Sequence, residues 1–436
     1  MNYFEELGVD ARVVANLTEN GLTEPTPIQT RAIPAALDGR DVMGLAQTGT
    51  GKTAAFGLPI VTKLLEVGRR PDPKTCRALI LAPTRELATQ ITENMQKFAK
   101  GTSVRTFRVV GGASLNAQAQ RLASGIDILV ATPGRLIDLL ERKALKLSEV
   151  RYLVLDEADQ MLDIGFIHAL RQIARLLPPK RQTMLFSATM PKLMEEISAA
   201  YLTNPVKVQV SPPGKVADKI EQGVHFTNQG EKAKLLAEYI SQHQGELALV
   251  FNRTKHGSDK LMKLLDGWGF SVGAIHGNKS QGQRERTLQA FRNGELKILV
   301  ATDVAARGID IPDVRHVYNF DLPNVAENYV HRIGRTARAG KAGRAVAFCA
   351  PAEFGELQAI EKIMKARIPV IGGTAPALAE ANAAAKAAKV KQGNRQGQGR
   401  NGGSSAHHSY GQKRNDGNTA RPARRPSRRP KGSKAA

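Results

Sequence analysis

Two short segments, far apart in the chain, carry the residue types that nucleotide hydrolysis needs. Segment 46–53 is rich in glycine, whose backbone N–H groups can surround phosphate oxygens, and it ends in Lys52 and Thr53. Asp156 and Glu157 follow an apolar run that has the character of a buried strand. A lysine for the phosphates, a threonine and an aspartate for Mg²⁺, and a glutamate to activate water form one reactive set. The sequence therefore predicts hydrolysis of a nucleoside triphosphate.

The glycine-rich segment departs from the usual phosphate loop at one position, since Ala46 stands where the first glycine is usually found. It still follows a strand-like run and opens a helix-like one, which is the context that phosphate binding requires. The residues expected to line the phosphates are Gln47, Thr48, Gly49, Thr50, Gly51, Lys52 and Thr53. We expect Thr53 and Asp156 to hold Mg²⁺ and Glu157 to deprotonate the attacking water.

Composition limits the classes of function. The 436 residues carry a net charge of +23 with a pI near 10.1, which favours a polyanionic partner such as nucleic acid over a merely basic soluble protein. The two cysteines, Cys76 and Cys349, lie far apart, so neither a disulfide framework nor a zinc site is expected. The start of the chain lacks the pattern of a signal peptide, and we expect a cytoplasmic protein without a membrane segment.

The arrangement of apolar runs indicates an α/β protein. Short continuous runs alternate with helical patterns from Asp41 to about Val210, which is typical of a parallel sheet covered on both faces. The strands are expected at 42–46, 78–82, 104–110, 126–131, 152–155 and 183–186, with helices at 85–100 and 113–123. A break rich in proline and glycine follows, and we expect a first domain at 1–210 and a linker at 211–219.

A second series of the same kind follows the linker. Strands are expected at 247–251, 271–275, 297–301, 314–318 and 345–348, and helices at 255–265 and 281–293, giving a second domain at 220–370. Residues 371–436 contain 14 Lys and Arg but only two acidic residues, and Gly, Gln, Asn, Ser, Pro and Arg dominate from Lys391 onward. We expect a disordered basic tail that tethers RNA, although a purely solubilising tail has the same composition.

Asp156-Glu157-Ala158-Asp159 resembles the signature of the DEAD-box RNA helicases, and the other motifs of that family occur here in order. The resemblance covers residues 2–370 and implies two RecA-like parallel-sheet domains in tandem, ATP as cofactor and RNA as partner. Around the motifs the chain is most similar to the bacterial RhlE-like group. Upstream lies a segment that resembles the family's adenine-binding motif, with Phe4, Leu22, Thr23, Pro27 and Gln29. The Gln29 amide is implied to read adenine, and Leu22 stands where the family usually has an aromatic residue.

Three segments of the first domain resemble motifs that hold the RNA backbone. Each is a turn after a strand with N–H groups, a hydroxyl or an arginine, which suits phosphodiesters rather than bases. The residues implied are Thr84, Arg85, Gly112, Thr132, Pro133, Gly134 and Arg135. Asp159, Ser187 and Thr189 are implied to couple hydrolysis to unwinding, as is His331 in the second domain.

The second domain carries the remaining motifs. By resemblance, Arg335 and Arg338 are arginine fingers for the γ-phosphate, and Asp310 contacts the ribose. Arg253, Thr302 and Asp303 are implied to face RNA. A glycine is more usual at Ala337, and we expect this change to have little effect.

The sequence thus predicts an ATP-dependent RNA helicase that separates short duplexes or remodels ribonucleoprotein, with ribosomal precursors or RNA-decay proteins among its possible partners and a monomeric state. Two other classes stay open. One is an RNA clamp or ribonucleoprotein chaperone in which ATP turnover times release, and the other is a DNA-directed helicase of the same superfamily. A metabolic P-loop kinase is disfavoured, because it explains neither the arginines of the second domain nor the tail.

Overall fold

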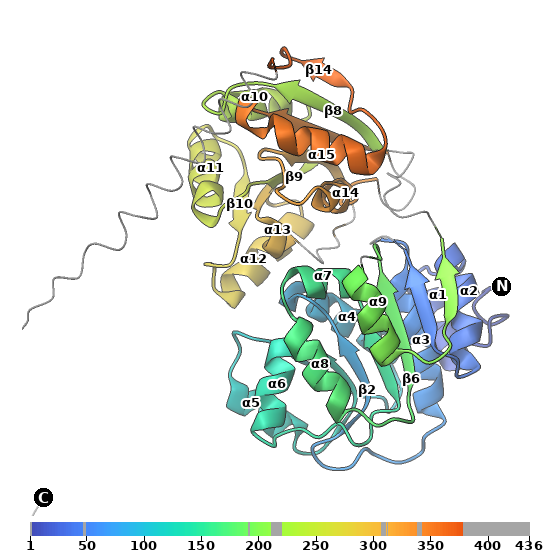
Figure 1. Cartoon of the computed structure of the whole chain (residues 1–436). Coiled ribbons are helices and arrows are strands. Elements are labelled where there is room, and N and C mark those ends of the chain that lie inside the picture. The colour runs from blue at the N-terminus through green and yellow to red at the C-terminus, as the bar shows by residue number, and fades with distance from the viewer. Residues whose placement is uncertain are drawn as a thin grey trace, which may run out of the picture. The chain divides into compact units, whose positions relative to one another are not determined.

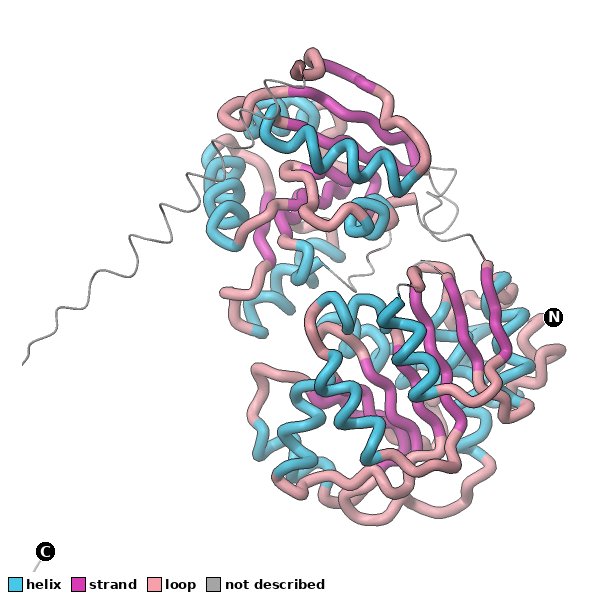
Figure 2. The backbone as a smooth tube through the Cα atoms, viewed as in Figure 1, coloured by secondary structure: helices cyan, strands magenta, loops and turns pink. Residues whose placement is uncertain are grey.

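The protein was analysed as a computed structural model, which describes residues 2–46, 49–190, 192–210, 220–306, 311, 313–337 and 342–377. The expected linker at 211–219 and most of the expected tail lie outside these residues. The predictions for Gln47, Thr48, Asp310 and Arg338 lie outside them as well. The described residues form two parallel sheets with helices against their faces (Figure 1; Figure 2).

The first sheet has the strand order β3-β4-β2-β5-β6-β1-β7, and its strands pair in parallel. Its strands are β1 Val42–Leu45, β2 Cys76–Leu81, β3 Thr106–Val109, β4 Ile126–Ala131, β5 Tyr152–Leu155, β6 Gln182–Ser187 and β7 Val206–Gln209. Its helices are α1 Ala11–Glu19, α2 Pro27–Leu37, α3 Lys52–Leu65, α4 Arg85–Phe98, α5 Leu115–Leu122, α6 Pro133–Glu141, α7 Ala158–Asp163, α8 Ile167–Leu176 and α9 Lys192–Tyr201.

The second sheet repeats this plan with the order β10-β11-β9-β12-β13-β8-β14. Its strands are β8 Ile220–Phe226, β9 Leu247–Phe251, β10 Val272–Ile275, β11 Ile298–Ala301, β12 Val314–Asn319, β13 Gly343–Cys349 and β14 Val370–Gly372. Its helices are α10 Lys232–Ser241, α11 Lys255–Gly267, α12 Gln281–Arg292, α13 Asp303–Ala306, α14 Glu327–Ile333, the 3₁₀ helix η1 Pro351–Glu353 and α15 Phe354–Met364.

Apolar residues on both faces of the central strands hold the layers together. Along β2, Ala78 and Ile80 belong to one core cluster, whereas Leu79 and Leu81 belong to another on the opposite face. Successive side chains of a strand point to opposite faces, so a strand that is covered on both sides must be apolar throughout. This explains why the central strands appear in the sequence as continuous apolar runs, and the α/β fold expected from them is confirmed.

The edges of the sheets differ more from expectation than the centres. Strands β7 and β8 were not anticipated, and β14 pairs with β8, so the boundary expected at residue 370 falls inside a strand. In the described part of the chain, no helix combines the length and apolar character needed to cross a membrane.

Parallel pairing gathers the motif residues at one edge of each sheet. In the first sheet, the phosphate loop follows β1, Thr84 follows β2, Thr132 follows β4 and Asp156 follows β5. The carboxyl ends of parallel strands lie at the same edge, which is where ligands bind in open α/β sheets. The fold therefore brings together residues that are far apart in the sequence.

Candidate nucleotide and RNA site

The turn between β1 and α3 has the backbone conformation of a phosphate loop. Gly49 and Gly51 have φ angles of 82° and 91°, in the left-handed region that glycine adopts without a steric penalty. A Cβ atom on Gly51 would lie 2.3 Å from the Gln29 Nε2 atom, so this position has no room for a side chain. Helix α3 begins at Lys52, and its N-terminus points its free N–H groups and dipole at the loop, which favours an anion.

Gln29 stabilises the phosphate loop from helix α2. Its Oε1 atom accepts a hydrogen bond from the Thr26 backbone N–H at 2.8 Å, and its Nε2 atom donates to the Gly51 carbonyl at 3.0 Å. The Thr26 hydroxyl donates to the Thr50 carbonyl at 2.8 Å. In this structure both ends of the Gln29 amide are thus bonded within the protein, and each end keeps capacity for one further hydrogen bond.

Three charged groups lie buried beside the loop. Lys52 is 5% exposed, and Asp156 and Glu157 are each 2% exposed. Among the described residues, the Lys52 Nζ atom and both carboxylate oxygens of Glu157 have no hydrogen-bond partner. Buried polar groups are normally paired, so this arrangement indicates a site built for a charged ligand. A triphosphate for Lys52, a divalent cation for Asp156 and a water molecule for Glu157 fit these groups.

The environment of Glu157 suits a general base. Burial raises the pKa of its carboxyl group to about 7, which the nearby Lys52 and Arg335 partly oppose and the carboxylates of Asp156 and Asp159 reinforce. Burial also raises the pKa of Asp156, against the effect of Lys52. A base with a pKa near the working pH transfers protons efficiently. Glu157 also adopts a left-handed backbone with φ 50°, an uncommon conformation for a residue other than glycine.

A cavity of about 580 Å³ joins these groups to an arginine of the second domain. Its lining includes Gln29, Lys52, Glu157 and Arg335, together with Gly49, Gly51, Thr53, Asp156 and Leu22. Among the other residues expected here, Thr23 is exposed, Pro27 begins α2, and Phe4 is 1% exposed within the core. The structure thus brings most of the predicted phosphate and metal residues together, and it places Phe4 in the core.

Asp159, the fourth residue of the acidic motif after β5, is hydrogen-bonded to the turn after β6. One carboxylate oxygen of Asp159 accepts from the backbone N–H of Ala188 at 3.1 Å, from that of Thr189 at 2.9 Å and from the Thr189 hydroxyl at 2.9 Å. The Ser187 hydroxyl donates to the Thr189 carbonyl at 2.7 Å. The acidic segment and the turn at 187–189 therefore form one hydrogen-bonded unit.

The predicted RNA-binding loops converge around a pair of glycines. A Cβ atom on Gly112 would lie 2.2 Å from the nearer guanidinium nitrogen of Arg85, so Arg85 can pack there only against glycine. Arg135 donates to the Ala113 carbonyl at 2.9 Å and lies near enough to Arg85 to lower its pKa, as burial and Arg284 also do. Thr84 and Thr132 are the N-cap residues of α4 and α6. Two arginines and two helix N-termini thus surround one loop, which suits a phosphate chain.

Sequence reasoning gave no role to Glu86, which follows Arg85. Its carboxylate pairs with the Arg284 guanidinium at 2.9 Å, and Arg85 donates to the Gln281 side chain at 3.3 Å. Glu86 and Arg284 are 5% and 9% exposed. The sequence did show a charged residue, Glu86, beside a predicted RNA-binding arginine. Its partner Arg284 lies far away in the sequence, so the ion pair could not be predicted from it.

Comparisons with known proteins identify the family of this chain. Residues 26–197 match the family model of the DEAD/DEAH box helicases, and residues 231–340 match that of the helicase conserved C-terminal domain. The chain is 44% identical over 370 residues to the ATP-dependent RNA helicase CshA of Listeria monocytogenes, covering 84% of this chain and 70% of that protein. The chain belongs to the DEAD-box helicase family.

Further relatives of this DEAD-box helicase agree in sequence and in fold. The chain is 45% identical over 365 residues to the DEAD-box ATP-dependent RNA helicase CshA of Streptococcus pneumoniae, covering 84% of this chain and 69% of that protein. S. cerevisiae Dbp5 bound to RNA and ADP BeF3 superposes with a TM-score of 0.76 at 31% identity, covering 90% of this chain and 98% of Dbp5. Mss116p bound to ssRNA and AMP-PNP superposes with a TM-score of 0.77 at 29% identity, covering 87% of this chain and 80% of the Mss116p chain. These matches support the tandem RecA-like fold.

In the second domain, two predicted RNA-binding residues of this DEAD-box helicase are held by ion pairs. The two carboxylate oxygens of Asp303 accept hydrogen bonds from the Arg332 Nε and Nη2 atoms, at 2.5 and 2.7 Å. Arg253 donates to Glu353 and to the Leu322 carbonyl, each at 3.0 Å. Arg332 is 2% exposed and lies 4.9 Å from the centre of the Phe251 ring. Sequence reasoning did not single out Arg332 or Glu353.

The remaining predicted residues of the second domain follow the strands β11 and β12. Thr302 precedes α13 and is 8% exposed. His331 lies in α14, and its carbonyl accepts a hydrogen bond from the Arg335 Nε atom at 3.2 Å. Helix α14 thus helps to fix the direction of the arginine that reaches the nucleotide cavity.

Proposed function

We propose that this protein is an RNA-stimulated ATPase that separates short RNA duplexes or remodels ribonucleoprotein. The observation that carries the proposal is the cavity in which Lys52, Asp156 and Glu157 of the first domain meet Arg335 of the second. Because catalytic groups come from both domains, turnover depends on how the domains engage RNA and nucleotide. Binding of both ligands then favours the active arrangement.

The chain's own residues have distinct roles in this proposal. Thr53 and Asp156 would hold Mg²⁺, which neutralises phosphate charge when bound with ATP. The Lys52 ammonium binds phosphate oxygens, and the Glu157 carboxylate accepts a proton from the attacking water. The Arg335 guanidinium stabilises the negative charge that develops on the phosphoryl group. Gln47, Thr48, Asp310 and Arg338 are proposed to act with them on the basis of the motifs alone.

RNA is the proposed polyanion. Arg85, Arg135 and the Gly111–Gly112 turn present cations and N–H groups to a backbone, which predicts weak sequence preference. The relatives Dbp5 and Mss116p were solved with RNA and single-stranded RNA respectively, which supports this ligand class. In an RNA clamp or ribonucleoprotein chaperone the same groups would bind, but short duplexes would not be separated.

The finer assignments rest on the sequence. We propose a cytoplasmic monomer of the RhlE-like group that acts on ribosomal precursors or with RNA-decay proteins. The relatives described above carry the name CshA, so the assignment to the RhlE-like group rests on the residues around the motifs. ATP and Mg²⁺ are the proposed cofactors.

Steady-state ATP hydrolysis tests the proposal, measured with the protein alone, with structured RNA and with DNA of matched sequence. We expect strong stimulation by RNA only, together with ATP-dependent separation of a short RNA duplex. Equal stimulation by DNA would contradict the RNA assignment. RNA-stimulated hydrolysis without strand separation would favour the clamp.

The basic tail is proposed to tether RNA. Because β14 extends to Gly372, a deletion that tests the tail should begin after residue 377 rather than at 371. We expect the truncated protein to keep its maximal ATPase rate but to need a higher RNA concentration, with a weaker dependence on salt. An unchanged RNA requirement would exclude the tether.

A further inference from the structure

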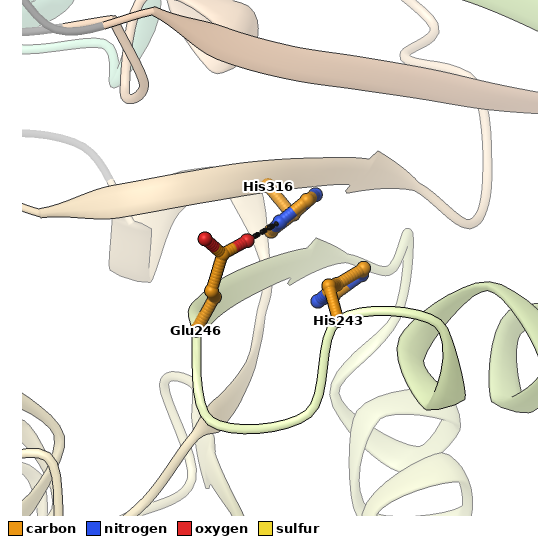
Figure 3. A group of neighbouring side chains, drawn as sticks. All are labelled: His243, Glu246 and His316. Carbon is orange, nitrogen blue, oxygen red and sulfur yellow. Dashed lines mark hydrogen bonds and ion pairs between the residues drawn. The ribbon is translucent and has the colours of Figure 1, made fainter.

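Two histidines and a glutamate of the second domain meet at a place that the ATPase cycle does not use. His243 and Glu246 lie in the turn between α10 and β9, and His316 lies in β12. The turn is closed by a hydrogen bond from the Glu246 N–H to the His243 carbonyl at 3.2 Å, with Gly245 at φ 95°. Strand β12 pairs with β9 and places His316 opposite Ala248, so the three side chains meet (Figure 3).

This cluster lies at the edge of the sheet opposite the helicase motifs. Glu246 immediately precedes β9, whereas Arg253 follows the end of that strand. At about 3.3 Å per residue, the cluster lies about 20 Å from the motif edge. A function of the cluster is therefore separate from ATP and RNA binding.

The three side chains have donor atoms in reach of one another. One ligand atom from each of His243, Glu246 and His316 lies within 4.8 Å of the other two. The His316 Nε2 atom lies 2.5 Å from the nearer Glu246 carboxylate oxygen, and the His243 Nε2 atom lies 2.5 Å from the Tyr318 hydroxyl. The two Nδ1 atoms are shielded from solvent and, within the part of the chain that the structure describes, have no hydrogen-bond partner. Shielded ring nitrogens without partners are uncommon.

The stacking and hydrogen bonding of the two imidazole rings suit metal binding. The two imidazoles stack with centroids 3.4 Å apart and planes 7° apart (Figure 3). A neutral imidazole keeps a lone pair for a metal, and the Tyr318 hydroxyl on the far nitrogen supplies the outer hydrogen bond that metal-bound histidines usually have.

We propose that His243, Glu246 and His316 form a site for a divalent transition metal, with zinc as the best match. Two imidazole nitrogens and one carboxylate oxygen are a ligand set that zinc accepts, with water as a fourth ligand. Calcium and magnesium require several oxygen ligands, and the cluster offers one carboxylate. Arg315 and Arg344 also lie close enough to act on the charges of Glu246 and His243, which disfavours a cation held by charge alone.

Metal binding requires a small rearrangement. A metal lies close to the plane of each imidazole that binds it, and two parallel stacked rings cannot share one such ion. One ring therefore has to tilt, and His243 is better placed to do so than His316, because it lies in a turn rather than in a strand. Glu246 is half-exposed and can move away from His316 to admit the ion. The bound metal would join the 243–246 turn to β12 and stabilise the second domain.

This inference differs from the sequence expectation, which excluded a zinc site because the two cysteines lie far apart. Cysteine is one of several zinc ligands, and histidine and glutamate serve equally. The spacing His243-x-x-Glu246 was visible in the sequence, but His316 is joined to it only by the pairing of β9 with β12.

The test is a zinc titration of the full chain in competition with a chromogenic chelator. The parent protein should carry His407→Gln and His408→Gln, because that histidine pair in the sequence offers a competing ligand. We expect one zinc per chain and a rise in the thermal unfolding temperature of the second domain. His243→Gln, His316→Gln and Glu246→Gln should each weaken binding at least tenfold and remove the thermal shift.

His256→Gln is the matched control, since His256 is an exposed histidine of α11 in the same domain. It should bind zinc like the parent. Glu246→Gln is the variant expected to disturb folding least, because the Glu246 side chain is half-exposed. RNA-stimulated ATPase activity reports whether each variant is folded. Zinc affinity that is the same in His316→Gln as in the parent, or no stoichiometric binding by the parent, would overturn the proposal. X-ray absorption of the zinc-loaded parent should show nitrogen and oxygen ligands without sulfur.

Discussion

A single carboxylate oxygen of Asp159 accepts hydrogen bonds from both the backbone N–H and the hydroxyl of Thr189, each at 2.9 Å. Asp159 is 4% exposed, so these bonds compensate a buried charge. The acidic segment that follows β5 is thereby tied to the turn that follows β6. A change at the nucleotide can thus reach that turn through one residue.

Thr189→Val tests this link, since valine keeps the shape of threonine but lacks the hydroxyl. We expect strand separation to fall at least tenfold relative to ATP hydrolysis, because the backbone bonds to Asp159 persist while the side-chain bond is lost. Loss of a hydrogen bond to a charged group costs about 1.5–3 kcal/mol. Thr189→Ser, which keeps the hydroxyl, is the control. Equal losses of hydrolysis and separation would make Thr189 part of the chemistry rather than of the coupling.

Glu157→Gln removes the proposed base and keeps its size. We expect RNA-stimulated turnover to fall by about 10²–10⁴, the usual contribution of a general base, with ATP and RNA binding retained. Binding is expected to persist or tighten, because the variant no longer buries a carboxyl group between two acidic neighbours. Single-turnover hydrolysis and equilibrium nucleotide binding check this. Turnover within a few-fold of the parent would remove Glu157 from the catalytic role.

Arg335→Ala tests the contribution of the second domain. We expect hydrolysis to fall by about 10³–10⁵ while ATP affinity in the absence of RNA changes little, since most of the cavity is lined by the first domain. Arg335→Lys keeps the charge but not the planar fork, and it should recover only a small part of the rate. Loss of ATP binding in both variants, or a lower unfolding temperature, would indicate a structural arginine.

The central parts of the fold and the phosphate site follow from local sequence. Gly49, Gly51 and Lys52 are adjacent in the chain, and the turn they form needs only the strand before it and the helix after it. The buried strands are apolar on both faces, so their runs are visible without knowledge of the sheet. The edge strands β7 and β14 have exposed residues and lack that pattern.

Partners that come from distant segments were not predictable in the same way. Asp303 lies in a motif that resembles an RNA-binding one, but its ion pair with Arg332 depends on how α13 packs beside α14. The bond from Gln29 to the phosphate loop likewise joins two separate segments and was not predicted. The role of Gln29 in reading adenine stays a prediction.

Ala337→Gly tests a site of backbone strain in the segment that carries the proposed arginine fingers. Ala337 has a φ of 57°, in the left-handed region, where a Cβ atom costs roughly 1–2 kcal/mol. Glycine removes that cost, but it also gives the unfolded chain more conformational entropy, which lowers the free energy of unfolding by about 0.4–1 kcal/mol. We therefore expect a net increase in the free energy of unfolding of about 0.5 kcal/mol. The ATPase rate should change less than twofold. Ala337→Val is the contrasting variant and should lower the free energy of unfolding. A loss of stability in Ala337→Gly would contradict the proposal that the backbone is strained at this position.

Asp303→Ala distinguishes an RNA contact from a structural ion pair. Arg332 is almost fully buried, and among the described residues removal of Asp303 leaves its guanidinium with the Asn319 side chain and the Asp321 carbonyl as hydrogen-bond acceptors. Breaking a buried pair costs about 3–5 kcal/mol, and because Asp303 is partly exposed we expect about 2 kcal/mol here. Denaturant unfolding should show this loss, and Asp303→Asn, which keeps one acceptor, should show less. If RNA affinity falls while unfolding is unchanged, Asp303 contacts RNA as the motif resemblance implied, and the ion pair with Arg332 gives way when RNA binds.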